Sequence, residues 1–153
     1  MTRSSKIVYL FISVLFFILF NGFLTDIIIQ NGYRLAENPV LQVLYVENIG
    51  AAFNIFEGYR VFLILFAATA MSVILFFTIK QIKRIPVFGL FFVSLLLAGI
   101  FNNMLERIMF GFVRDFIKLK FVDFPVFNIS DLFINIAVIG IVFIILKYGY
   151  FKK

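Results

Sequence analysis

Four long apolar segments alternate with more polar ones along the chain. Residues 7–24, 59–79, 86–105 and 129–146 each come close to the ~20 apolar residues that a helix needs to cross a ~30 Å hydrocarbon core. The first polar segment, residues 25–58, includes a strand-like stretch at residues 40–46. The pattern predicts an all-α membrane protein with four transmembrane helices and a small extracytoplasmic β element in the first long loop, in one domain over residues 1–153.

Composition supports a membrane protein and narrows its chemistry. Of the 153 residues, 63% are hydrophobic and 14% are charged, and the mean hydropathy is +1.10. Cysteine and histidine are absent, which excludes thiol nucleophiles, Ser-His triads and zinc sites built from these ligands. We therefore expect no metal and no cofactor. The first apolar run is long for a signal peptide and no small-x-small cleavage site follows it, so it is interpreted as the first span.

The charges indicate an orientation. One set of span ends carries basic residues without any acid: Arg3, Lys6, Lys80, Lys83, Arg84, Lys147, Lys152 and Lys153. All aspartates and glutamates fall in the other segments. The positive-inside rule then places both termini in the cytoplasm and both long loops outside, as in a bacterial inner membrane. Because the basic residues follow the span ends and form no patch with exposed aromatics, nucleic-acid binding is not expected.

Two aspartates stand out in this apolar chain. Asp115 and Asp131 each lie within a few residues of a span, so both should sit near the outer membrane face. Two carboxylates in a partly dry site cannot both ionise cheaply, so one can hold a proton while the other acts as a base, as in aspartic proteases. From spacing alone an alternative stays open, in which Asp131 caps the fourth helix together with Asn128 and Ser130 and Asp115 is a solvated loop residue.

Other polar residues could assist. Asn103 and Arg107 are separated by four positions and share a helix face, where an amide and a guanidinium could orient a carboxylate or hold a substrate backbone. Arg107 could instead extend to the membrane interface. The stretch that begins at Asn48 contains Gly50 and two alanines, which leave room for another backbone to come close.

Taken together, these stretches resemble the lipoprotein signal peptidases, or signal peptidase II, over nearly the whole chain. That family has four spans with both ends inside and four sequence boxes: Asn-x-Gly-Ala-Ala-Phe/Trp, Gly-Asn-x-x-Asp-Arg, Gly-x-Val-x-Asp-Phe/Met-Ile and Phe-Asn-x-Ala-Asp. The corresponding stretches here are Asn48-Ile49-Gly50-Ala51-Ala52-Phe53, Asn102-Asn103-Met104-Leu105-Glu106-Arg107, Gly111-Phe112-Val113-Arg114-Asp115-Phe116-Ile117 and Phe127-Asn128-Ile129-Ser130-Asp131.

The resemblance implies an aspartyl endopeptidase. It would remove signal peptides from diacylglyceryl-modified prolipoproteins on the amino side of the lipidated cysteine. Asp115 and Asp131 would be the catalytic pair. The residues lining the substrate site or supporting the pair would be Asn48, Gly50, Asn103, Arg107 and Asn128. The implied partners are the prolipoprotein and membrane lipid, and we expect a monomer.

The chain also departs from the family pattern. Asn21-Gly22-Phe23-Leu24-Thr25 stands where the family usually has Asp-x-x-Ser/Thr-Lys, and the changed positions in the other boxes are Asn102, Glu106 and Ser130. Asp26 is a candidate to replace part of the lost charge. These changes motivate a second hypothesis, a catalytically impaired relative that binds lipidated or transmembrane peptides without cleaving them. A third, a small transporter or channel subunit, would place ionisable residues at mid-membrane depth, whereas all charges of this chain lie near the ends of the spans.

Overall fold

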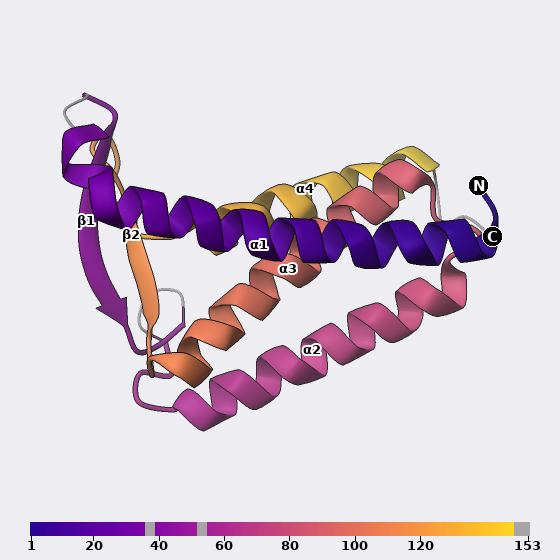
Figure 1. Cartoon of the computed structure of the whole chain (residues 1–153), viewed down its shortest axis with the longest axis horizontal. Coiled ribbons are helices and arrows are strands. Elements are labelled where there is room, and N and C mark those ends of the chain that lie inside the picture. The colour runs from indigo at the N-terminus through magenta and orange to yellow at the C-terminus, as the bar shows by residue number, and fades with distance from the viewer. Residues whose placement is uncertain (36–38, 52–54, 149–153) are drawn as a thin grey trace.

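The computed structural model of the protein describes residues 1–35, 39–51 and 55–148. The elements are α1 (Arg3–Leu35), β1 (Leu41–Asn48), α2 (Arg60–Gln81), α3 (Val87–Met109), β2 (Val113–Leu119) and α4 (Ile129–Tyr148). Figure 1 shows the four helices as an elongated bundle with the two strands across one end. The start of α1, the turn between α2 and α3 and the end of α4 lie at the opposite end.

All four helices are long and apolar enough to cross a membrane, which confirms the predicted fold class. The start of α1 and the other three helices follow the predicted segments closely. The prediction was wrong at the end of α1, where residues 25–35 form helix and not loop. No proline interrupts the chain before Pro39, and Ile28 and Ile29 pack on the core beneath the sheet, so the helical pattern continues beyond Leu24.

Helix α3 is the centre of the bundle and packs against α1, α2 and α4. Two glycines let α3 and α4 approach closely. A Cβ at Gly99 would lie 2.7 Å from the Ser130 carbonyl oxygen, and a Cβ at Gly140 would overlap the Phe92 ring. Small residues at such crossings are how membrane helices gain contact area, because lipid supplies no hydrophobic drive to associate. The Gly99 contact fixes the first turn of α4 beside the C-terminal half of α3.

The β element joins two distant segments. β1 pairs with β2 in an antiparallel sheet, with Val46 opposite Asp115 and Asn48 opposite Val113, and Phe127 forms a bridge with Ile117. The sequence predicted an extended element in the first loop only, and it treated residues 108–128 as an irregular loop. That part was wrong, because the partner strand is supplied by the second loop. The pairing places Asp115 inside a strand and not in a solvated turn.

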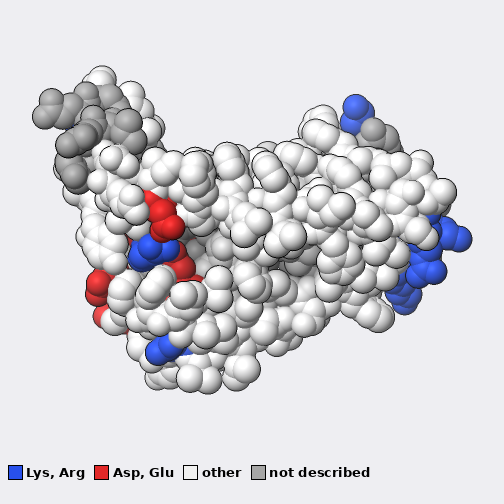
Figure 2. Space-filling view, viewed as in Figure 1, with Lys and Arg blue, Asp and Glu red and all other residues white. Residues whose placement is uncertain are grey.

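Charge is distributed unequally between the two ends. On the face drawn in Figure 2, the acidic side chains gather at the sheet end, beside some basic ones, while the far end shows only basic side chains. This matches the segregation predicted from the sequence for the part of the chain that the structure describes. Lys152 and Lys153 lie outside the described residues.

Candidate active site

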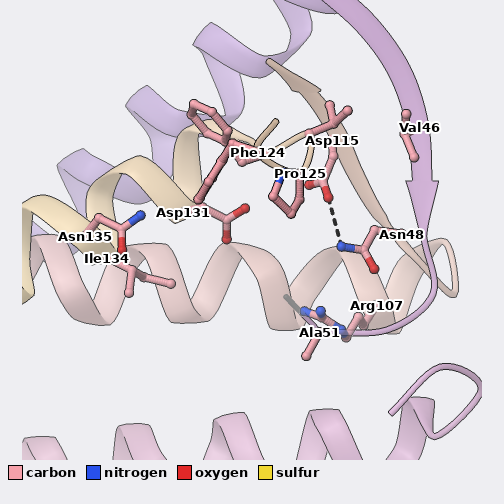
Figure 3. A pocket seen from close by; sticks show the side chains of 12 residues that line it. Val46, Asn48, Ala51, Arg107, Asp115, Phe124, Pro125, Asp131, Ile134 and Asn135 are labelled. Carbon is pink, nitrogen blue, oxygen red and sulfur yellow. Dashed lines mark hydrogen bonds between the residues drawn. The ribbon is translucent and has the colours of Figure 1, made fainter. Parts of the chain in front are cut away.

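Asp115 and Asp131 come from different elements and line the same cavity. Asp115 lies on β2 and Asp131 lies in the first turn of α4. The cavity has a volume of about 700 Å³, and Asn48 and Arg107 also line it. Figure 3 shows both carboxylates directed into the space between the sheet, the end of α3 and the start of α4. The fold therefore brings the two aspartates together, although a long stretch of sequence separates them.

Two amides hold the carboxylate of Asp115. Asn48 Nδ2 donates to Oδ2 at 2.9 Å and Asn128 Nδ2 donates to Oδ1 at 2.7 Å. The residue is only 2% exposed, so the alternative of a solvated Asp115 is wrong. Burial raises the pKa of Asp115 to about 6, and the nearby charge of Asp131 adds to the rise, while the two amides and Arg107 oppose it.

Asp131 is held by Asn103 and by the backbone. Asn103 Nδ2 donates to Asp131 Oδ1 at 2.8 Å. The Asn128 backbone N–H donates to Asp131 Oδ2 at 3.3 Å, and the Asp131 N–H donates to Asn128 Oδ1 at 3.0 Å. This reciprocal pair is a capping box, with Asn128 as the N-cap. The capping role considered for Asp131 is therefore correct, but the same carboxylate also lines the cavity.

The remaining predicted residues connect these two carboxylates. Asn128 Nδ2 also lies 3.2 Å from Asn103 Oδ1. Arg107 donates through Nη1 to the Asn103 carbonyl at 3.0 Å and through Nη2 to the Gly50 carbonyl at 2.7 Å. The Gly50 N–H donates to Asn48 Oδ1 at 2.9 Å. All seven residues named from the sequence thus belong to one network. Ala52 and Phe53, from the first box, lie outside the described residues.

Three of the positions that depart from the family pattern meet behind this network. Thr25 Oγ1 donates to Asn21 Oδ1 at 3.3 Å, and Asn21 Nδ2 donates to Ser130 Oγ at 2.9 Å. All three residues are buried. Asn21 and Thr25 on α1, which stand where the family pattern has charged residues, are therefore accompanied by the Ser130 hydroxyl on α4, which accepts a hydrogen bond from the Asn21 amide. Neither change was interpretable from the sequence alone, because the contact depends on which faces of α1 and α4 are turned toward each other.

The charged departures form a separate cluster. Arg114 donates to Glu106 through its side chain, with a shortest distance of 2.7 Å, and its backbone N–H donates to the same carboxylate at 2.8 Å. Asp26 lies 3.4 Å from Arg114 Nη1. Asp26 is largely exposed, so this pair contributes little to stability. Asp26 joins α1 to β2 and does not take part in the network of Asn21 and Ser130.

Removing the Ser130 hydroxyl measures how much its hydrogen bond with Asn21 contributes to stability. In Ser130→Ala, the buried Asn21 amide loses its acceptor, so we expect the free energy of unfolding to fall by about 1–3 kcal/mol. Detergent-solubilised protein unfolded with SDS and followed by circular dichroism measures this. Ser72→Ala is the matched control, because the exposed Ser72 hydroxyl donates only to a carbonyl of its own helix, and no comparable loss is expected. Equal stability of Ser130→Ala and wild type would contradict the prediction.

The pKa of Asp115 predicts a pH dependence of stability. The pKa of an unfolded aspartate is about 4, whereas in the fold the pKa of Asp115 is raised to about 6. The folded state holds this proton more tightly, so the stabilisation is complete below the unfolded pKa and is lost as the pH rises through the folded pKa. Between about pH 4 and pH 7, we expect wild type to lose about 2 kcal/mol of unfolding free energy that Asp115→Asn does not lose. Parallel pH profiles of the two proteins in SDS unfolding would contradict this.

Sequence reasoning missed the walls of the cavity. Phe124, Pro125, Val126 and Phe127 line one side, and Ile134 and Asn135 of α4 line another. Residues 124–126 follow β2 without regular structure and Phe127 forms only the bridge to Ile117, so no periodic pattern marked this segment. Asn135 carried a signal that was overlooked, since a polar residue inside a transmembrane segment commonly faces a cavity or the bundle interior.

Comparisons with known proteins place the chain in a family. The family model described as Signal peptidase (SPase) II matches residues 14–147. A lipoprotein signal peptidase of Dehalococcoides mccartyi strain BAV1 is 38% identical and covers 74% of this chain and 71% of its own. Another, from Lactobacillus gasseri, is 32% identical and covers 97% of each chain. A solved structure of a bacterial membrane enzyme matches 98% of this chain and 92% of its own, with a TM-score of 0.77 and 28% identity. The chain belongs to the signal peptidase II family, and it is a membrane-embedded peptidase of four apolar helices.

Proposed function

We propose that this peptidase is an aspartyl endopeptidase. It cleaves diacylglyceryl-modified prolipoproteins on the amino side of the lipidated cysteine and so releases the signal peptide. The observation that carries the proposal is that Asp115 and Asp131 line one cavity beside membrane-length helices. The relatives named lipoprotein signal peptidases support the class of substrate.

The catalytic step follows from two carboxylates that share one site. The ionised carboxylate takes a proton from water, and the water oxygen attacks the carbonyl carbon of the scissile peptide. The protonated carboxyl polarises the carbonyl oxygen and stabilises the tetrahedral intermediate. The carboxyl that took the proton from water then donates it to the nitrogen as the C–N bond breaks, which leaves a carboxylate on the signal peptide and an amine on the cysteine, and the other aspartate is protonated again. With its pKa raised to about 6, Asp115 can hold or release a proton near neutral pH.

The supporting residues have distinct tasks in this proposal. Asn48, Asn103 and Asn128 orient the carboxylates through the hydrogen bonds described above. Arg107 joins α3 to the loop at Gly50 and contributes positive charge beside both aspartates. The apolar wall that includes Phe124 and Ile134 suits an acyl chain or an apolar peptide side chain. A cavity of about 700 Å³ falls in the usual range for ligand sites, ~300–1,000 Å³.

The position of the site suits a substrate that arrives within the bilayer. We infer that the sheet end faces outward and that both termini are cytoplasmic, because the opposite end carries the basic residues. The chain would act as a single domain and a monomer. Under this orientation the carboxylates lie near the outer interface, where water is available and a lipid-anchored peptide can enter sideways.

A catalytically impaired relative is the alternative. It was suggested by the missing Asp and Lys near Asn21 and Thr25. The hydrogen bonds that join these residues to Ser130 support an intact helix contact there, and both aspartates keep their amide donors. These observations favour the enzyme over the impaired relative.

The proposal is tested with purified protein in detergent. The substrate is a prolipoprotein that carries diacylglyceryl-cysteine, and release of the signal peptide is followed on a gel and by mass spectrometry. We expect cleavage directly before the lipidated cysteine and no cleavage of the same precursor with an unmodified cysteine. Absence of cleavage by folded protein, while another lipoprotein signal peptidase is active under the same conditions, would favour the impaired relative.

A further inference from the structure

Asn135 is an isolated polar side chain on the most apolar helix of the bundle. Between Asp131 and Lys147, α4 contains no other polar side chain. Asn135 lines the cavity beside Ile134 and is exposed. Within the part of the chain that the structure describes, its amide makes no hydrogen bond. Figure 3 shows the Asn135 side chain on the same side of α4 as Asp131, along the wall of the cavity.

An amide in this position has an energetic cost. A polar group placed in an apolar environment without a partner loses about 1–3 kcal/mol on the scale of protein mutations. Polar residues within membrane spans accordingly tend to face a cavity or a binding partner. Asn135 does not stabilise the bundle through a hydrogen bond to any other described residue. A bound ligand is therefore the partner that would satisfy its donor and its acceptor.

The depth of Asn135 indicates which part of a substrate it meets. It is four residues after Asp131, so it lies about 6 Å farther along the helix axis, away from the sheet end. An extended peptide advances about 3.3 Å per residue, so this depth corresponds to roughly two residues from the scissile bond. The apolar part of a signal peptide enters the membrane, whereas the lipidated cysteine stays near the interface. Acyl chains at this depth present no hydrogen-bonding atoms.

We propose that Asn135 is a substrate-positioning residue that hydrogen-bonds the backbone peptide group about two residues before the scissile bond, on the signal-peptide side. The proposal rests on the proposed function, because it requires a cleaved signal peptide. An extended backbone in a largely apolar cavity has N–H and C=O groups that need partners, and a side-chain amide offers one acceptor and two donors for them. Asn135 would thereby align the peptide with the two carboxylates while remaining distant from the reacting atoms.

Steady-state kinetics provide the first test. Asn135→Leu keeps a similar shape and removes the amide. Because the lost contact is made equally in the bound substrate and in the transition state, KM should rise about tenfold while kcat changes less than about twofold. Ile136→Ala, an exposed neighbour on α4 that does not line the cavity, should leave both constants near wild type. Asn135→Gln, which retains the amide, should recover part of the affinity.

A set of ester-containing substrates tests the backbone contact itself. Synthetic diacylglyceryl-cysteine peptides carry an ester in place of one of the three peptide bonds that precede the scissile bond. An ester lacks the N–H and is a weaker acceptor, so one position should raise KM for wild type several-fold and have no further effect in Asn135→Leu. If at every position the ester raised KM by the same factor in Asn135→Leu as in wild type, the proposal would be overturned. That result is expected if Asn135 contacts a diacylglyceryl ester carbonyl. If wild type is active and Asn135→Leu has wild-type kinetics, the role of Asn135 is overturned and the proposed function stands. If folded wild type is inactive, the proposed function and this inference are overturned together.

Discussion

Asp115→Asn and Asp131→Asn are each expected to lower the rate of signal-peptide release by about 10³-fold or more. An asparagine amide has nearly the shape of the carboxylate but cannot take a proton from water or donate one to the leaving amine, and acid-base catalysis alone is worth ~10²–10⁴-fold. Because the two groups work as a unit, the double variant should be hardly slower than either single variant. Release of the signal peptide under single-turnover conditions measures all three proteins.

The fold of these variants should survive the substitutions. At position 115, an asparagine oxygen can still accept a hydrogen bond from one of the two amides that face it, Asn48 and Asn128. Asp123→Asn is the control, because Asp123 is a fully exposed carboxyl near the same end of the molecule, paired with Lys118. Its cleavage rate should stay within about twofold of wild type. If either Asp115→Asn or Asp131→Asn retained more than a tenth of the wild-type rate, the dyad would be excluded from the mechanism.

The helices were predictable from hydropathy, while the sheet was only half predictable. Apolar length shows where hydrocarbon is crossed, but it does not show how far a helix continues beyond the bilayer, and so the final part of α1 up to Leu35 was missed. β2 was missed because its pairing with β1 is non-local, and a strand that contains Arg114, Asp115 and Lys118 has no clear alternation of apolar residues. A partner strand remote in sequence leaves little local signal.

The site shows the same division. The identities of the two aspartates and their amide donors could be named from short sequence boxes, since each box keeps its residues at fixed spacing. Which donor meets which carboxylate depends on helix rotation and strand register, which the sequence does not report. The contact between Asn21 and Ser130 is of this second kind. It depends on how α1 meets the first turn of α4, where Ser130 also lies against Gly99 of α3.

Lys6→Met is expected to lower the free energy of unfolding by about 3 kcal/mol. The sequence suggested only that Lys6 marks the cytoplasmic side. In the structure it is buried, and Nζ donates to the carbonyls of Ile82, Lys83 and Ile85 at 3.2, 3.1 and 2.6 Å. These carbonyls lie in the turn that follows α2, where they are beyond the last helical hydrogen bonds. The ammonium also ties the start of α1 to the turn between α2 and α3, so methionine would break three charge-assisted contacts at once.

Arg3→Met is the control that separates the effect of the lost carbonyl contacts from the effect of the lost positive charge. Both variants remove one positive charge from the same end of the bundle, so any effect on membrane insertion through the positive-inside rule should be shared. Arg3 is exposed, and its loss should change the unfolding free energy by less than about 0.5 kcal/mol. SDS unfolding followed by circular dichroism compares the two variants with wild type. Equal stability of Lys6→Met and Arg3→Met would mean that the three carbonyls are satisfied without the lysine. A selective loss of stability in Lys6→Met would show that the lysine, through its three carbonyl contacts, fastens the end of the bundle opposite the candidate active site.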